Sequence, residues 1–146
     1  MTKEVLVAIT GLQFDMDSEE SDITTITAGE YYKRNNSHYV LYDEVVEGTE
    51  GNTKNVVKFR DNMLELTKKG YINTHMIFEV DKKNLTNYST PFGDILIGID
   101  AKKVTLKEEE NKITVNVDYT LEANYEFLAE CKLTMEIAEK EHATLF

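Results

Sequence analysis

The sequence predicts an all-β protein: a single antiparallel, up-and-down β-barrel of about eight to ten strands. Apolar and polar residues alternate along most of the chain, which is the pattern of strands that bury one face. Turn-forming residues interrupt this alternation at intervals typical of a β-sandwich or β-barrel. No linker, internal repeat or low-complexity tract divides the chain, so residues 1–146 are expected to form one domain.

The first half of the chain is expected to form strands that are joined mainly by tight hairpins. Asn35-Asn36-Ser37 and Asp61-Asn62 are the predicted hairpin connections, because Asn and Asp tolerate the positive φ that such turns use. The predicted strands are Glu4–Gln13, Asp22–Glu30, Tyr31–Arg34, His38–Val46, Lys54–Arg60 and Met63–Lys69.

A proline turn and a change of phase mark the next strands. Thr74–Val80 places Phe78 on an apolar face, and Leu85–Thr90 then runs into Thr90-Pro91-Phe92-Gly93. Proline at the second place and glycine at the fourth suit a type I turn. Apolar residues then fall at odd positions from Ile95 to Ala101, but at even positions for Val104 and Leu106. This slip predicts a β-bulge at Lys102-Lys103.

The clearest alternation runs from Ile113 to Ile137, where every odd position is apolar and every even position except Leu128 is polar. Its later half is rich in residues that prefer helix, but a helix would spread the apolar side chains around its whole circumference. One straight strand would be roughly 80 Å long, far more than a domain with a radius of gyration of about 15 Å can hold. Two long strands with a turn at Asn124 are therefore expected.

The two ends of such a meander would leave exposed sheet edges unless the sheet closes on itself or pairs face to face. Short connections between sequential strands favour an up-and-down barrel over a Greek-key sandwich.

Composition restricts the partners and the compartment. The net charge of −11, with 27 acidic and 16 basic residues, argues against nucleic acid or an anionic membrane as a partner. No apolar stretch is long enough to span a membrane and no signal peptide is evident. The only cysteine, Cys131, cannot form an internal disulfide, which favours a cytoplasmic setting. A homo-oligomer or a protein partner stays open.

The order of several short motifs resembles the YwiB-like family, bacterial proteins of unassigned function with a calycin-type, lipocalin-like β-barrel. The motifs are Tyr39-Val40-Leu41-Tyr42-Asp43-Glu44, Gly70 before Met76-Ile77-Phe78-Glu79, Tyr88-Ser89-Thr90-Pro91-Phe92-Gly93, and Asp118-Tyr119-Thr120-Leu121-Glu122. The resemblance implies a barrel and a cytoplasmic, bacterial setting, and it brings no catalytic residues or ligand with it.

The chain departs from that family at Lys68, where the family usually has Arg two residues before its glycine. Lysine cannot make the planar bidentate contact of arginine, which weakens the case for an anion clamp there. Lipocalins and biotin-binding barrels both use tryptophan, and this chain has none, so neither subgroup is supported.

Known catalytic and metal-binding patterns are missing, so no catalytic residue, metal site or cofactor is predicted. The acidic run Asp15–Asp22 begins like a calcium loop, but it has Glu20 where the sharp turn needs Gly and Ile26 where the last ligand should be Glu. His38, His75 and His142 are too scattered for a zinc motif, and His75 is expected at the surface or rim. Cys131 lies on the apolar side of its strand and is interpreted as a buried, inert thiol.

Three hypotheses of function follow from this interpretation. The leading one is a non-enzymatic barrel that binds a small, mostly apolar molecule at one open end, because about eight strands enclose either a filled core or one small ligand. The alternative is a structural or protein-interaction module with a filled barrel. The third is an enzyme with carboxylates and tyrosines at the barrel mouth. Candidate ligand-binding residues are Tyr42, Glu44, Phe78, Tyr88 and Phe92.

Overall fold

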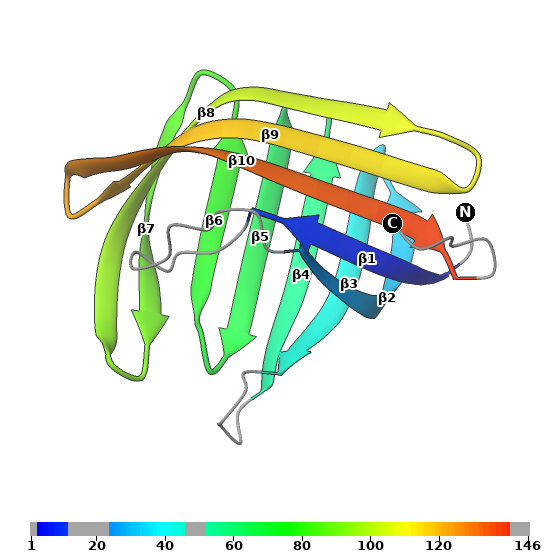
Figure 1. Cartoon of the computed structure of the whole chain (residues 1–146), viewed down its shortest axis with the longest axis horizontal. Coiled ribbons are helices and arrows are strands. Elements are labelled where there is room, and N and C mark those ends of the chain that lie inside the picture. Colours follow the sequence, from blue (N-terminus) through cyan, green and yellow to red (C-terminus); the bar gives the residue numbers. More distant parts are fainter. Residues whose placement is uncertain (1–2, 12–23, 46–51, 141–146) are drawn as a thin grey trace.

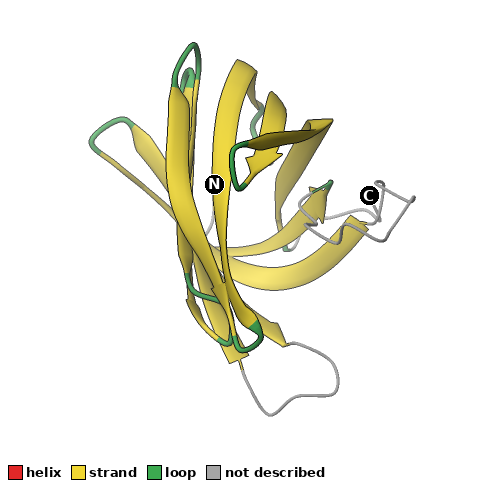
Figure 2. Ribbon diagram, turned by 90° about the vertical axis from the view of Figure 1, so that its left-hand side faces the viewer, coloured by secondary structure: helices red, strands yellow, loops and turns green. Residues whose placement is uncertain are grey.

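The computed structural model describes residues 3–11, 24–45 and 52–140, and these residues form ten antiparallel strands (Figure 1). The strands are β1 (Glu4–Thr10), β2 (Thr24–Arg34), β3 (Ser37–Val45), β4 (Asn52–Arg60), β5 (Met63–Gly70), β6 (Thr74–Glu79), β7 (Lys83–Thr90), β8 (Gly93–Glu108), β9 (Lys112–Ala123) and β10 (Glu126–Glu139). No helix occurs in the described residues, as Figure 2 shows, so none there could cross a membrane.

All ten strands belong to one sheet with the order β6-β5-β4-β3-β2-β1-β10-β9-β8-β7. Each strand therefore lies beside its neighbour in sequence, and the first and last strands pair with each other through β1 and β10. This is the predicted up-and-down meander, and it curls into a nearly closed, calycin-like barrel (Figures 1 and 2).

The barrel is completed at a seam between β6 and β7, where isolated bridges replace a continuous ladder. At one end of the seam Asn73 and Ser89 exchange backbone hydrogen bonds of 3.0 and 2.9 Å. At the other end Val80 bridges to Ala101, next to a 3.1 Å bond from the Asp81 N–H to the Ala101 carbonyl. The seam leaves β6 with fewer backbone partners than the strands elsewhere in the described sheet.

The predicted hairpin turns are confirmed and are made by residues with positive φ. Asn35 and Asn36 have φ of 52° and 66°, and Asn124 and Tyr125 have φ of 51° and 69°. Two successive residues in this conformation give the twist that matches paired strands. The sequence-based split between Asp22–Glu30 and Tyr31–Arg34 is wrong, because the pairing continues without a break through β2.

Two β-bulges alter the phase of the long strands. The register shift between Ala101 and Lys103 confirms the predicted bulge in β8. A second shift, between Phe127 and Ala129 in β10, was not expected and corrects the simple alternation of that strand. Phe127 is consequently 64% exposed. Pairing of β1 with β10 also ends at Thr134, so the earlier part of β10 lies beyond the end of β1.

The hydrophobic core lies inside the barrel and is made of the side chains that alternate inward along each strand. Val117 is fully buried while its neighbour Asn116 is exposed, which confirms the predicted face assignment of β9. The largest fully buried side chains include Phe59, Phe78, Leu64, Leu66, Met76, Ile99, Ile113, Met135 and Ile137.

The acidic run Asp15–Asp22, which was compared with a calcium loop, lies outside the described residues.

Candidate binding site at one end of the barrel interior

Polar side chains occupy inward-facing positions at the end of the barrel where β3 finishes and β4 begins. On β4, Thr53 and Asn55 are as buried as the apolar Val57 and Phe59 that follow them at the same spacing. The strand period of two therefore directs all four side chains into the barrel. The inner surface of β4 is therefore polar at its first two inward positions and apolar at its last two.

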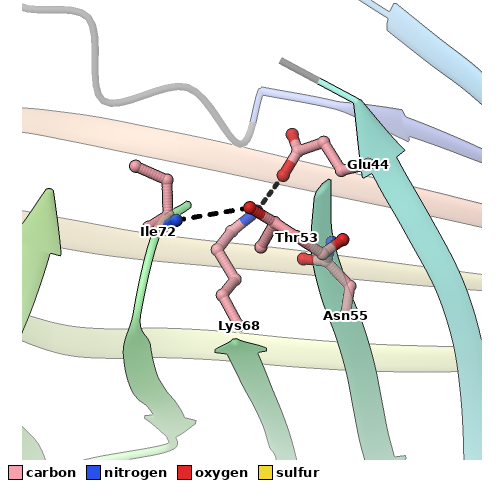
Figure 3. A network of polar contacts seen from close by, with 5 residues as sticks. All are labelled: Glu44, Thr53, Asn55, Lys68 and Ile72. Atoms are coloured by element: carbon pink, nitrogen blue, oxygen red, sulfur yellow. Dashed lines mark hydrogen bonds and ion pairs between the residues drawn. The ribbon is translucent and has the colours of Figure 1, made fainter. Parts of the chain in front are cut away.

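Sheet register aligns these polar groups across three neighbouring strands. Tyr42 of β3 lies opposite Asn55 of β4, and Asn55 lies opposite Lys68 of β5. Glu44 lies opposite Thr53 one step nearer to the end of the barrel. We call Tyr42, Glu44, Thr53, Asn55, Lys68 and Tyr88 the polar cluster (five residues of this region are shown in Figure 3).

The centre of the cluster is an ion pair between Lys68 and Glu44. Lys68 Nζ donates to Glu44 Oε1 over 2.9 Å, from strands separated by β4 (Figure 3). The lysine residue is only 6% exposed, and a buried ammonium is stable only when it is paired and hydrogen-bonded. Glu44 therefore provides the charge that allows Lys68 to be buried.

The turn between β5 and β6 holds the neighbouring part of the cluster in place. The Ile72 N–H donates to Thr53 Oγ1 over 3.3 Å (Figure 3), and Asn73 Nδ2 donates to the Gly70 carbonyl over 2.8 Å. Gly70 has a φ of 143°, and a side chain there would collide with the Asn52 backbone. Glycine at this position thus allows the turn to lie against the start of β4.

Asn55 carries an unsatisfied hydrogen-bond acceptor inside the barrel. Its Nδ2 donates to the Thr53 carbonyl over 3.3 Å, which fixes the amide so that Oδ1 points the other way. Oδ1 is buried and has no hydrogen-bond partner, although the residue is only 1% exposed. Most buried polar atoms in proteins have a partner, so this oxygen is the point of the cluster that can accept a further hydrogen bond.

Two tyrosines complete the cluster, and both keep their protons at neutral pH. Burial, reinforced by the negative charge of Glu44, raises the pKa of Tyr88 to about 12. The same two causes raise the pKa of Tyr42 well above its ordinary value. Both side chains pack against the hydrophobic core while remaining partly buried. They combine an apolar ring with a hydroxyl that stays a neutral hydrogen-bonding group.

The structure brings together three of the five sequence-predicted candidates, Tyr42, Glu44 and Tyr88. Phe78 is fully buried, and its ring meets Tyr119 edge-on at 4.9 Å, so it is part of the core. Phe92 lies at the tip of the turn between β7 and β8 and is 92% exposed. The proline turn therefore does not bring Phe92 against Tyr88, because it directs the phenylalanine outward.

Sequence reasoning missed Thr53 and Asn55 as site residues, and it noted Lys68 only as a departure from a family pattern. A signal was present in β4: Val57 and Phe59 define the inward positions, and Thr53 and Asn55 share that spacing. Polar residues in the buried phase of a strand are the observation that would have identified the cluster.

Other reactive side chains in the described part of the chain include His75 and Cys131. Within it, no three His, Cys, Asp or Glu side chains are placed to hold a metal ion. His75 has a side chain 53% exposed, as expected. Cys131 is half-buried rather than fully buried, because it lies on the part of β10 beyond β1. Burial raises the pKa of its thiol, which keeps it a weak nucleophile.

The opposite end of the barrel contains a buried tyrosine–histidine contact and a surface pocket. Tyr31 and His38 are both buried there, with 2.6 Å between the tyrosine hydroxyl and His38 Nδ1. His38 also stacks on Phe59 with 4.9 Å between ring centroids. Outside this pair a surface pocket of about 600 Å³ is lined by Tyr31, Lys33 and Glu108 among others. The side chains of Lys33 and Glu108 in this pocket are each about half exposed to solvent.

The fold is a calycin-like β-barrel with a polar cluster at one end of its interior. Residues 7–135 match the model of the family described as domain of unknown function DUF1934, and the chain belongs to that family. No curated protein matches the sequence.

A solved structure is similar over almost the whole chain. It is the crystal structure of the ywiB protein from Bacillus subtilis, with a TM-score of 0.76 and 18% sequence identity. The match covers 94% of this chain and 91% of the other. At this level of identity the likeness shows the fold alone.

Proposed function

We propose that the protein is a non-enzymatic barrel that binds a small, mostly apolar molecule, with the molecule's polar end at the cluster around Lys68 and Glu44. The observation that carries the proposal is the buried, unsatisfied Asn55 Oδ1 beside the ion pair of a buried lysine, in a barrel whose interior is mostly apolar. Small-molecule sites typically combine apolar walls with a few fixed polar groups. A cytoplasmic setting is part of this proposal, because a lone cysteine requires no oxidising compartment.

The size of the barrel supports the same proposal. Barrel diameter grows with strand number, and about eight strands already leave an interior that side chains just fill or that holds one small ligand. The described sheet has ten strands. Tyr42, Tyr88 and Ile95 are partly buried against the core, in contrast to the fully buried residues around Phe78. We therefore expect the ligand's apolar body to lie against these partly buried side chains.

The alternative is a protein-interaction module with a filled barrel, and one observation favours it. Large apolar side chains are exposed at two hairpin tips: Phe92 is 92% exposed, Tyr125 73% and Phe127 64%. Exposed aromatic residues are common in protein interfaces. They lie on the outside of the barrel, so this alternative would leave the polar cluster unused.

The first test is to identify any small molecule that co-purifies with the protein. The mass of the purified protein should be measured under native conditions and again after denaturation, and a discrete extra mass that is released on unfolding is expected. The second test is titration with Nile red, a neutral dye that fluoresces in apolar sites. Tyr88→Ala should weaken dye binding at least about fivefold, whereas Tyr125→Ala, the same substitution at an exposed turn, should leave it within about twofold.

The two variants also separate the alternatives. Absence of any co-purifying molecule together with absence of dye binding would contradict the ligand proposal and leave the interaction module. Dye binding that Tyr125→Ala abolishes and Tyr88→Ala preserves would place the apolar surface outside the barrel, with the same consequence. Thermal unfolding of both variants checks that each is folded.

A further inference from the structure

The charges of the polar cluster cancel. Lys68 contributes one positive charge and Glu44 one negative charge, and their atoms are 2.9 Å apart. Tyr42 and Tyr88 are neutral near pH 7 because their hydroxyls keep their protons. This end of the barrel interior therefore offers a ligand a strongly polar surface without an uncompensated charge.

The polar cluster lacks one hydrogen bond, and the unsatisfied group is an acceptor, so the missing partner is a donor. Asn55 Oδ1 is an acceptor, and it is buried without a partner. Leaving such a group unsatisfied destabilises the folded protein. The direction of the amide is fixed, because Nδ2 already donates to the Thr53 carbonyl. A molecule that occupies this position is stabilised if it brings an O–H or N–H.

No donor of the described residues reaches Asn55 Oδ1, and two nearby donors have acceptors of their own. Lys68 Nζ donates to Glu44. The hydroxyl of Thr74, which lies opposite Lys68, donates to the Asn87 carbonyl over 2.9 Å. A donor for Asn55 would therefore come most readily from outside the protein.

Resting on the proposed binding function, we infer that the ligand's polar end is an uncharged hydrogen-bond donor, an alcohol or an amide N–H, rather than a carboxylate. An alcohol or amide can donate to Asn55 Oδ1 and leave the pair between Lys68 and Glu44 intact. A carboxylate has no proton to donate at neutral pH. At Lys68 it would compete with Glu44 for the ammonium, and it would bring a second negative charge to a place where the one positive charge is already paired.

The test compares ligands that share a chain and differ at one end. Binding of decan-1-ol, decanamide and decanoate to the full chain is measured by displacement of Nile red at neutral pH. The alcohol and the amide should bind at least about tenfold more tightly than decanoate. Asn55→Leu, which removes the acceptor and keeps the branching and the number of side-chain heavy atoms, should reduce that preference to about twofold or less. Asn116→Leu, on the exposed face of β9, should keep the wild-type preference.

The outcomes distinguish this inference from the function on which it rests. Decanoate binding as tightly as the alcohol, or more tightly, would overturn the inference and leave the binding function intact. An unchanged preference in folded Asn55→Leu would also overturn it. Failure of all three compounds to bind would overturn both. The ranking on the wild-type protein needs no variant, so the inference remains testable if Asn55→Leu does not fold.

Discussion

Lys68 and Glu44 share an ion pair but differ in their surroundings: the lysine side chain is 7% exposed and the glutamate side chain 40%. The two partners therefore depend on the pair to different degrees. Without Glu44 the ammonium would be buried without compensation, whereas without Lys68 the carboxylate could still reach water.

This asymmetry predicts unequal losses of stability. Glu44→Gln should lower the free energy of unfolding by about 2–3 kcal/mol, whereas Lys68→Met should change it by no more than about 1 kcal/mol. Urea denaturation measures both. Lys107→Met, at an exposed pair with Glu109 whose side chains are 77% and 51% exposed, is the control and should stay within about 0.5 kcal/mol. A larger loss for Lys68→Met than for Glu44→Gln would contradict this account of the pair.

The two faces of β9 give a prediction about the core. Val117 is fully buried, so Val117→Asp should cost at least about 3 kcal/mol by burying an unpaired charge. Asn116→Asp keeps the side-chain oxygen that accepts a 2.9 Å hydrogen bond from Thr134, and should stay within about 0.5 kcal/mol. The denaturation midpoints of the two variants are the measurement. Similar losses would mean that the inward face has been assigned incorrectly.

His38 predicts how stability depends on pH. Burial lowers the pKa of its imidazole, an effect partly opposed by Glu108. Below the ordinary histidine pKa of about 6.5, the unfolded chain binds a proton that folded His38 resists, so the free energy of unfolding falls as the pH is lowered.

The test measures unfolding at pH 7.5 and pH 5.5. The wild-type protein should lose about 1 kcal/mol more than His38→Gln over this interval. The difference between the two pH values is the readout, so a constant effect of the substitution itself does not matter. Equal losses, or an imidazole that titrates above its ordinary pKa in an NMR experiment, would refute the prediction.

Nucleic acid is not expected as a partner. With a net charge of −11, the chain should bind no DNA or RNA oligonucleotide with submicromolar affinity at physiological salt. Fluorescence anisotropy with labelled single- and double-stranded oligonucleotides measures this. Tight binding that weakens steeply with added salt would show a basic surface that the composition conceals.

The period of two was enough to predict most of the fold, because one face of each strand is buried. Ile113–Ile137 was resolved into two strands although its composition favours helix, and the φ of 51° at Asn124 confirms the turn. The same rule failed at Phe127, because the bulge that exposes it depends on pairing with β9. It also failed at Cys131, which is half-buried because β1 ends before reaching it. No local pattern shows how far one strand extends beside another.

The candidate site was less predictable than the fold. Glu44 and Tyr88 could be chosen as polar and aromatic residues near turns, but their relation to Lys68 depends on the register of three strands. Phe92 was placed wrongly because a turn motif fixes the backbone path without fixing the direction of the side chain at its tip. Long-range register and the direction of a side chain at the tip of a turn are tertiary properties. The alternation within one strand carries little information about either.

Pairing between β1 and β10 also limits when the protein can fold. Val5 lies opposite Glu139, so the contact that closes this side of the barrel joins residues near opposite ends of the described chain. On the ribosome, the edge of β1 that faces away from β2 stays unpaired until β10 has emerged. Folding rates fall as contacts become less local, and unpaired strand edges favour aggregation. The net charge of −11 makes incompletely folded chains repel one another, which opposes such aggregation.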